Sequence, residues 1–348
     1  MEKKAIGFFQ KYLTVWVLLC MGVGVLIGHF IPSVGEFLSS LEVASVNIPI
    51  AVLIWLMIFP MMLKIDFTSI KQVGKQPKGL FLTWVVNWLI KPFTMFGISC
   101  LFFYVIFKGI IPYELAKDYL AGAVLLGAAP CTAMVFVWSS LAKGNPAYTL
   151  VQVATNDLII LVLFVPIVGI LLAVGGFLIP WGTLFLSIAL FVVIPLLLAT
   201  ITRILIVKKK GVEFLDEQVV PKFSPFTSVG LLIMLVLLFT MQAELIIDSP
   251  LHILLIAVPL VLQTFIIFGI SFCGAKLLKL PFDIAAPAGF IGASNFFELA
   301  VAVAISLFPL NPGASLASVV GVLTEVPVML MLVKIANASK GWFANHKT

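Results

Sequence analysis

The chain consists largely of long apolar runs separated by short polar segments. A window of about 20 residues, the length that crosses the hydrocarbon core of a bilayer, picks out ten such runs. In a bilayer every backbone N–H and C=O group must be paired within the protein, so these runs predict transmembrane helices. The predicted spans lie at about residues 12–31, 43–63, 80–107, 119–140, 148–174, 181–207, 225–243, 250–278, 284–308 and 313–335.

The composition places the chain among polytopic membrane proteins. Hydrophobic residues make up 62% of the 348 residues and charged residues only 10%, which no ordinary soluble domain matches. The first run is too long for a secretory signal peptide, and no small-residue cleavage site follows it, so we expect it to be the first span. The net charge of +6 comes from lysines in short loops, and no nucleic-acid partner is expected.

The four cysteines are far apart in the sequence, and all lie inside or at the ends of apolar runs. No CxxC pair occurs, so the sequence predicts neither a disulfide framework nor a closed zinc site, and no cofactor is expected. Cys20, Cys100 and Cys273 are expected to be small buried hydrophobic residues. Cys131 differs from these three because it directly follows a proline inside an apolar run.

Lysine and arginine are concentrated on one side of the predicted membrane. Eighteen of the 21 fall on that side, against Lys108 and Lys117 on the other, and Lys91 lies inside a span. Positive charge marks the cytoplasmic face, so we expect a multi-pass protein of the plasma membrane with both termini in the cytoplasm. The eighteen are Lys3, Lys4, Lys11, Lys64, Lys71, Lys75, Lys78, Lys143, Arg203, Lys208, Lys209, Lys210, Lys222, Lys276, Lys279, Lys334, Lys340 and Lys347.

The longest polar segment divides the ten spans into five and five. We expect residues 1–348 to form one polytopic membrane domain in which a cytoplasmic linker, 208–224, lies between the spans of the second half. The first five-helix repeat is predicted over 1–175, and the second over 176–207 and 225–340.

Two short matches relate the halves. Gly127-Ala-Ala-Pro130 matches Gly292-Ala-Ser-Asn295 at a shift of 165 residues, and Phe96-Gly-Ile-Ser99 matches Phe268-Gly-Ile-Ser271 at a shift of 172. The matches connect the fourth span with the ninth and the third with the eighth. Because each half has an odd number of spans, the second half enters the membrane from the opposite side, and the sequence predicts an inverted repeat.

The fourth and ninth spans are interrupted at corresponding positions. The fourth is broken at Gly127–Pro130 and the ninth at Gly292–Asn295. Proline removes a helical N–H and frees backbone groups, which is tolerated only where they are buried in protein or face water. Such paired interruptions are the best sequence pointer to a binding site at the bilayer midplane. We therefore expect two discontinuous helices to cross at their breaks.

Cys131 places a sulfur atom at this crossing. The half-helix after it would direct unpaired N–H groups and the positive end of its dipole at the site, and sulfur suits a soft, thiophilic substrate. Glu298 lies three residues after the second break, and an acid at this depth is a candidate for proton coupling. The predicted substrate-binding residues are Cys131, Thr132, Ser294, Asn295 and Glu298.

Four further polar residues fall inside spans and need a partner or water at that depth. Lys91 precedes a proline in the third span, Asn156 and Asp157 lie in the fifth, and Glu325 lies in the tenth. Asp157 and Glu325 correspond at a shift of 168 residues, which suggests paired roles in the two halves. A structural role and a proton-relay role are both open for these residues.

The motifs around the breaks resemble those of a known family. With GAAPCTAMVFVWS at 127–139 and GASNFFELAVAVAI at 292–305, the chain closely resembles the arsenite efflux permeases of the bile acid, arsenite and riboflavin transporter superfamily. NWLIKP at 87–92 and TEVP at 324–327 support the resemblance, which extends over nearly the whole chain.

The resemblance implies a ten-helix carrier, with a panel and a core domain, that exports arsenite and often antimonite in exchange for protons. It implies that Cys131 and Glu298 are the essential residues. Some members of the family have a further cysteine in the fifth span, and this chain has none between Tyr148 and Val174. One thiol with polar neighbours such as Thr132 is therefore expected to bind the substrate.

Two other functions fit parts of the sequence. A sodium-coupled organic-anion symporter of the same fold would need several oxygen ligands around each ion, and Ser294, Asn295 and Glu298 are few for that purpose. An intramembrane enzyme with Cys131 as nucleophile would need a base such as histidine, and the three histidines lie at run ends or in the tail. No GxxxxGKS motif for a nucleotide occurs. The sequence therefore favours a secondary transporter over an enzyme.

Overall fold

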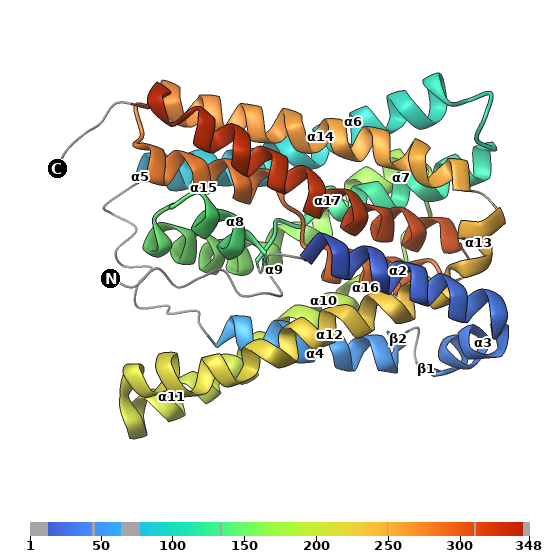
Figure 1. Ribbon diagram of the computed structural model, residues 1–348. Helices are drawn as coiled ribbons and strands as arrows, with labels where there is room; N and C mark the ends of the chain where they lie inside the picture. The colour runs from blue at the N-terminus through green and yellow to red at the C-terminus, as the bar shows by residue number, and fades with distance from the viewer. Residues whose placement is uncertain are drawn as a thin grey trace.

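The computed structural model describes residues 13–43, 46–63, 77–132, 134–248, 250–309 and 311–343, and nearly all of these are helical (Figure 1). A small antiparallel hairpin, β1 (Glu42–Val43) and β2 (Val46–Asn47), connects two helices. The helices up to the first break are α2 (Leu13–Phe30), α3 (Pro32–Ser40), α4 (Ile48–Met62), α5 (Pro77–Val85), η2 (Val86–Ile90), α6 (Lys91–Cys100), η3 (Leu101–Ile106) and α7 (Tyr113–Ala128).

The remaining helices follow the first break. They are α8 (Val135–Leu141), α9 (Pro146–Val174), α10 (Trp181–Ile188), η4 (Ala189–Val193), α11 (Ile194–Phe214), η5 (Leu215–Val219), α12 (Val220–Met241), α13 (Ala243–Asp248), α14 (Pro250–Leu277), α15 (Phe282–Ala293), α16 (Phe297–Leu307), α17 (Pro312–Ala338) and η6 (Lys340–Trp342). Most predicted apolar runs correspond to one helix, to a consecutive series, or to the two halves of a broken one, whereas the run at 43–63 begins in the β1–β2 hairpin before α4. Among the described residues, five helices are long and apolar enough to cross a membrane, or six if the sharply bent pair α2–α3 counts as one span. The ten-span count stays a prediction.

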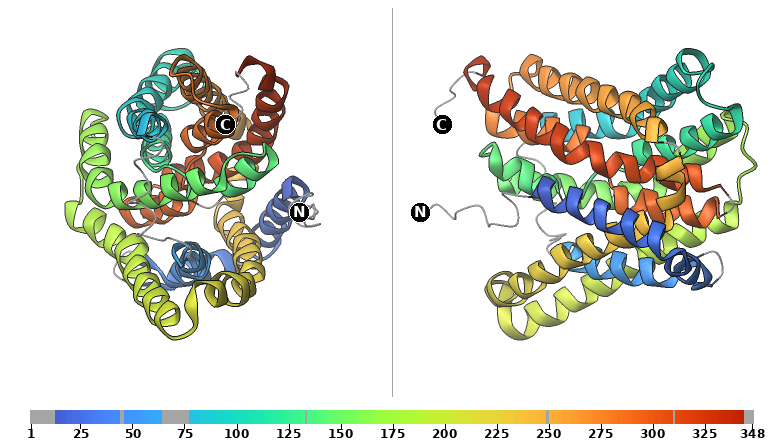
Figure 2. Two further views of the ribbon diagram at one scale, coloured as in Figure 1. Left: turned by 90° about the vertical axis from the view of Figure 1, so that its left-hand side faces the viewer. Right: turned by 45° about the vertical axis from the view of Figure 1, so that its right-hand side comes forward.

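The helices form two packed groups. In the first group α12 packs against α2 and α4, and α11 packs against α4. In the second group α17 packs against α7 and α14, and α14 packs against α15 and α6. In Figure 1 the first group lies below the second. The left-hand view of Figure 2 looks nearly along the helices and separates the two groups. The short helices α10 and α16 connect the groups, because α10 packs on α16 and α16 packs on α4.

One order of elements occurs twice in the second group. A pair of short helices separated by a break, α7 and α8, is followed by the long helix α9, and the pair α15 and α16 is followed by the long helix α17. This recurrence fits the predicted repeat. The inverted relation between the halves stays a prediction.

Proline explains most of the π-helical turns. The turns η2, η4 and η5 each end two residues before a proline, at Pro92, Pro195 and Pro221. Proline cannot donate to the preceding turn and its ring clashes with the carbonyl four residues back, so the chain widens there into a π-turn. In η2 the backbone N–H of Lys91 accordingly bonds with the carbonyl of Val86. Lys91 therefore enters α6 from a widened turn.

The predicted linker is helical over most of its length. It begins within α11, and Gly211 bends that helix sharply with φ 85° and ψ 168°, a conformation that glycine adopts without strain. The start of α5, the bent end of α11 and the end of α17 lie on the same left-hand side of Figure 1. Several lysines used for the predicted orientation lie outside the described residues: Lys3, Lys4, Lys11, Lys64, Lys71, Lys75 and Lys347.

The outer surface of the helices is strongly apolar, as contact with lipid requires. Large side chains that are more than half exposed include Leu89, Val105 and Val162. Cys131 is buried, whereas Cys20 and Cys100 are partly buried and Cys273 is exposed. The expectation of a buried hydrophobic residue is wrong for Cys273, because an apolar residue of a membrane helix can face outward as readily as inward.

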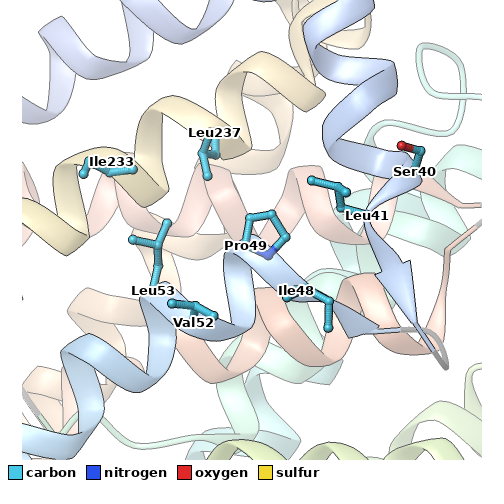
Figure 3. Close-up of a pocket in the computed structure, with 8 residues that line it drawn as sticks. All are labelled: Ser40, Leu41, Ile48, Pro49, Val52, Leu53, Ile233 and Leu237. Atoms are coloured by element: carbon cyan, nitrogen blue, oxygen red, sulfur yellow. The ribbon is translucent and has the colours of Figure 1, made fainter.

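An open groove of about 610 Å³ lies between α4 and α12 (Figure 3). Its lining is almost wholly aliphatic, with Ser40 as the one hydroxyl side chain among residues such as Val52 and Leu237. It contains none of the predicted site residues. A groove of this chemistry suits apolar chains and offers nothing to a small polar solute.

Candidate functional site

The two breaks lie directly against each other. Pro130 and Asn295 form an isolated antiparallel bridge between them. The backbone N–H of Phe296 donates to the carbonyl of Ala129 at 2.9 Å, and that of Cys131 donates to the carbonyl of Ser294 at 3.4 Å. Backbone groups that the breaks leave without helical partners are thus paired across the crossing, as a low-dielectric interior requires. The predicted meeting of the two breaks is confirmed.

Lys91 and Glu325 hold the second break from two sides. The Lys91 ammonium, only 1% exposed, donates to the carbonyl of Ser294 at 2.6 Å. The Ser294 hydroxyl donates a short hydrogen bond to Glu325, whose carboxylate also accepts from the backbone N–H of Asn295 at 3.3 Å. Ser294 therefore stands between a cation and an anion, which interact electrostatically through the protein interior.

Cys131 and Glu298 occupy the same neighbourhood. Both side chains are 2% exposed. The thiol of Cys131 interacts with the Ser294 hydroxyl and with the backbone N–H of Val135, and it lies within electrostatic range of Glu298 and Glu325. Thr132, Ser294 and Asn295 are buried as well. The crossing thus gathers one sulfur, two carboxyl groups, one ammonium and several hydroxyl and amide groups.

Two local details differ from what the sequence predicts. The second half of the fourth span, α8, begins at Val135 rather than beside Cys131. Cys131 therefore lies in the link between α7 and α8, because the cross-break backbone pairing holds it there. Likewise α16 begins at Phe297, so Glu298 lies in its first turn while Asn295 precedes the helix. The three-residue spacing of Asn295 and Glu298 would fit one face of a helix, but the two residues do not lie on the same helix.

Asn156 and Asp157 form no hydrogen bond to the breaks among the described residues. Asn156 accepts a hydrogen bond from the indole N–H of Trp88 at 3.2 Å, which ties α9 to η2. Asp157 is 2% exposed, and its Oδ1 atom has no hydrogen-bond partner among the described residues. In the described part of the chain no hydrogen bond joins Asp157 to the breaks. Glu325 thus accepts hydrogen bonds at the crossing, whereas Asp157, its predicted counterpart in the first half, makes none there among the described residues.

Gln263 is a site residue that the sequence analysis missed. It lies in α14, is 1% exposed, and donates from Nε2 to the carbonyl of Lys91 at 3.1 Å and to the hydroxyl of Thr94 at 2.9 Å. It fixes the turn from which the Lys91 side chain reaches the crossing. An amide in the middle of the eighth apolar run was the available signal.

A polar hollow of about 560 Å³ lies at the far ends of the crossing helices. It is lined by the start of α7 and the end of α16, and includes Glu114, Lys117 and Asp118. Asn311 donates to Asp118 at 2.9 Å, and the Lys117 ammonium lies 4.8 Å from the centre of the Phe177 ring. This hollow is separate from the crossing, because α7 is 16 residues long and its other end carries the break.

The match to a family model includes the first break, and the matches to relatives extend over nearly the whole chain. Residues 51–249 match the family described as the Sodium Bile acid symporter family. The chain is 61% identical to Arsenical-resistance protein Acr3 of Alkaliphilus metalliredigens, over 98% of this chain and 96% of that protein. It is 46% identical to an uncharacterized transporter of Synechocystis, over 97% and 91%. It is 31% identical to Arsenical-resistance protein Acr3 of Corynebacterium glutamicum, over 94% and 88%.

Proposed function

Because the chain belongs to the arsenical-resistance permease family, within the wider sodium/bile acid symporter family, we propose that it exports arsenite from the cytoplasm in exchange for protons. Antimonite, which has the same thiophilic chemistry, is a second substrate under this proposal. The observation that carries the proposal is the 61% identity, over nearly the full length of the chain, to a relative named for arsenical resistance. The buried thiol at the crossing supports it, because arsenic is a soft element that prefers sulfur.

Cys131 is the proposed substrate ligand. Trihydroxy arsenic is neutral near pH 7, and the thiol sulfur replaces one of its hydroxyl groups, which leaves as water with the thiol proton. The remaining hydroxyl groups need hydrogen-bonding partners, which Thr132, Ser294 and Asn295 supply; the Oδ1 atom of Asn295 is buried and has no partner in the described structure. On the outer side, water attacks the arsenic and hydrolyses the single arsenic–sulfur bond, which releases trihydroxy arsenic and restores the thiol.

Glu298 is the proposed proton carrier. The substrate loads from the cytoplasm while Glu298 is unprotonated, and a proton taken from outside after release permits the return of the empty carrier. Its position in range of the Cys131 thiol and of Glu325 supports this competition at one site. Because arsenite is neutral, voltage does not oppose its export. At about 150 mV one entering charge supplies roughly 3.5 kcal/mol, on the order of a 300-fold gradient.

The proposed topology follows from the same pattern. We place ten spans in the plasma membrane as two inverted five-helix repeats, with the termini and the 208–224 segment in the cytoplasm. The recurring order of a broken pair followed by a long helix supports the repeat. The shared side of the α5 start, the α11 end and the α17 end supports the orientation (Figure 1). Alternating access then moves the two helix groups against each other around the crossing.

Arsenite accumulation in everted membrane vesicles tests this function. We expect a pH gradient, acidic inside the vesicle, to drive accumulation by the wild-type protein, and an uncoupler to abolish it. A sodium gradient of the same size, imposed without a pH gradient, should drive none. Vesicles that accumulate no arsenite under a pH gradient, although they hold the folded protein, would contradict the proposal.

A sodium-coupled organic-anion symporter is the second candidate, because the matched family is described by sodium symport. It would use the same crossing, with oxygens of Ser294, Asn295 and Glu298 around the ion. Uptake of an organic anion such as a bile acid that follows a sodium gradient and ignores a pH gradient would favour it. The vesicle experiment separates the two candidates because it imposes each gradient alone.

A further inference from the structure

The second break has the chemistry of a monovalent cation site. The helix α15 ends at Ala293, so its last carbonyl groups carry the negative end of the helix dipole. Carbonyls of unwound backbone and half-helix C-terminal ends are the groups with which carriers coordinate sodium or protons. At this break the carbonyl of Ser294 points to a partner on α6, and the carboxylate of Glu325 lies on the other side of the same residue.

Two further buried oxygen atoms belong to the break itself and to the neighbouring helix α14. The Oδ1 atom of Asn295 and the Oε1 atom of Gln263 are buried and have no hydrogen-bond partner among the described residues. Asn295 follows Ser294 in the break, and Gln263 bonds to the carbonyl of Lys91. Carbonyl, carboxylate and amide oxygens are the ligands that hard cations prefer. The break and its surroundings therefore include oxygen atoms that could bind a cation and that accept no hydrogen bond from the described residues.

The positive charge at this point belongs to the chain itself. The Lys91 ammonium lies 2.6 Å from the Ser294 carbonyl, and its side chain is 1% exposed. A buried ammonium is costly unless a negative group compensates it, and Glu325 supplies that charge. The π-turn before Pro92 and the Gln263 hydrogen bond to the Lys91 carbonyl hold the lysine backbone so that its side chain reaches the break.

We propose that the Lys91 ammonium is a tethered cation, which fills at the second break the position where a sodium-coupled carrier binds a free ion. The proposal rests on the proposed function for its placement of the break at the transport site. Under the proposed function, it accounts for transport without sodium in a family described by sodium symport, because the stabilising cation is part of the chain. Removing the ammonium should leave the charge of Glu325 without a cation, and a sodium ion should then occupy the vacated space beside the Ser294 carbonyl, which among the described residues keeps only its hydrogen bond from the Cys131 N–H.

Thermal unfolding of the purified protein in matched chloride salts tests this inference without any arsenite. The wild-type protein should unfold at the same temperature in sodium, potassium and choline chloride. The Lys91→Ala protein should unfold several degrees lower in choline and recover much of the loss in sodium, because a ligand that binds only the folded state stabilises it. Choline is too large to enter, and it serves as the baseline for ionic strength.

Matched variants separate a cation site from simple damage. The Lys91→Ala/Glu325→Gln protein should show no sodium response, because the anion that attracts the ion is gone. The Lys276→Ala protein loses an exposed lysine of α14 and should behave as the wild type in all three salts. If Lys91→Ala does not yield folded protein in choline, its recovery from sodium-containing detergent is the readout, and sodium-dependent recovery supports the inference.

Two results would overturn the inference. One is a Lys91→Ala protein that is equally unstable in sodium and choline, or equally unrecoverable from both. The other is a wild-type protein that sodium stabilises over choline, because the position would then already bind a free ion. Neither result depends on arsenite transport, so a failure here is distinguishable from a failure of the proposed function in the vesicle experiment.

Discussion

The proposed site holds one thiol, and a carrier must release the substrate that it binds. Of the four cysteines, Cys131 is the buried one, and its neighbours are hydroxyl, amide and carboxyl groups rather than further sulfurs. Arsenic held by one sulfur exchanges that ligand for water far more readily than arsenic held by two or three. Sequence reasoning reached Cys131 and Glu298 because cysteine after proline, and an acid in an apolar run, are conspicuous. Gln263 was not predicted, because an amide in an apolar run does not by itself show which neighbouring helix it contacts.

Replacing the thiol should weaken arsenite binding. We expect Cys131→Ser to lose at least about tenfold in arsenite affinity, the equivalent of 1.4 kcal/mol, because oxygen is a poor ligand for a soft element. Cys100→Ser, in the partly buried end of α6, should keep wild-type accumulation. Initial rates over a range of arsenite concentrations measure both. A Cys131→Ser protein with an unchanged concentration dependence would remove sulfur from the site.

Replacing the proposed proton carrier should uncouple transport from pH. Glu298→Gln resembles the protonated form permanently, and we expect it to accumulate no arsenite at any pH gradient. Glu298→Asp keeps a titratable group and should retain gradient-driven transport at a reduced rate. Glu36→Gln, on the exposed face of α3, is the control and should match the wild type. A Glu298→Gln protein that still responds to the pH gradient would assign coupling to another group.

At the scale of elements, the breaks were predictable and their exact ends were not. Glycine and proline in the fourth span and small residues in the ninth predicted the interruptions. The starts of α8 and α16 depend on backbone hydrogen bonds between segments more than 160 residues apart, such as that from Phe296 to Ala129, which no local pattern encodes. Pro92 indicates that the helix is distorted near Val86–Ile90. The position of Lys91 could not be predicted, because it depends also on the hydrogen bond from Gln263 in α14.

The broken helix α7 should tolerate no side chain where it crosses α17. A Cβ atom at Gly122 would lie 2.2 Å from the carbonyl oxygen of Ala314 and 2.7 Å from the Cβ of Ala317. Because those obstacles include backbone, α7 and α17 must move apart, and we expect Gly122→Ala to destabilise the protein by about 1–3 kcal/mol. Gly97→Ala is the matched control, because nothing lies within 4 Å of its added Cβ. Thermal unfolding of the two purified variants measures the difference, and equal melting temperatures would contradict this packing.

At the scale of the whole molecule, hydropathy predicted the helical runs but not how they group. In a bilayer, a helix face toward lipid is as apolar as a face toward protein, so the sequence could not show which sides of α14 or α2 are buried. Exposed Cys273 illustrates the point. Buried polar residues mark inner surfaces, and those around Cys131, Ser294 and Glu325 lie together at the crossing within the second helix group.

The central claim is that arsenite binds at Cys131 inside this crossing. The direct measurement uses a protein in which Cys20, Cys100 and Cys273 are replaced by serine, reconstituted in an active form and treated with a small maleimide in the presence and absence of arsenite. The account predicts that the reagent modifies Cys131 slowly and that arsenite slows the modification further, with a concentration dependence equal to that of transport. Labelling that proceeds at the same rate under saturating arsenite, in protein that still transports it, would contradict the account.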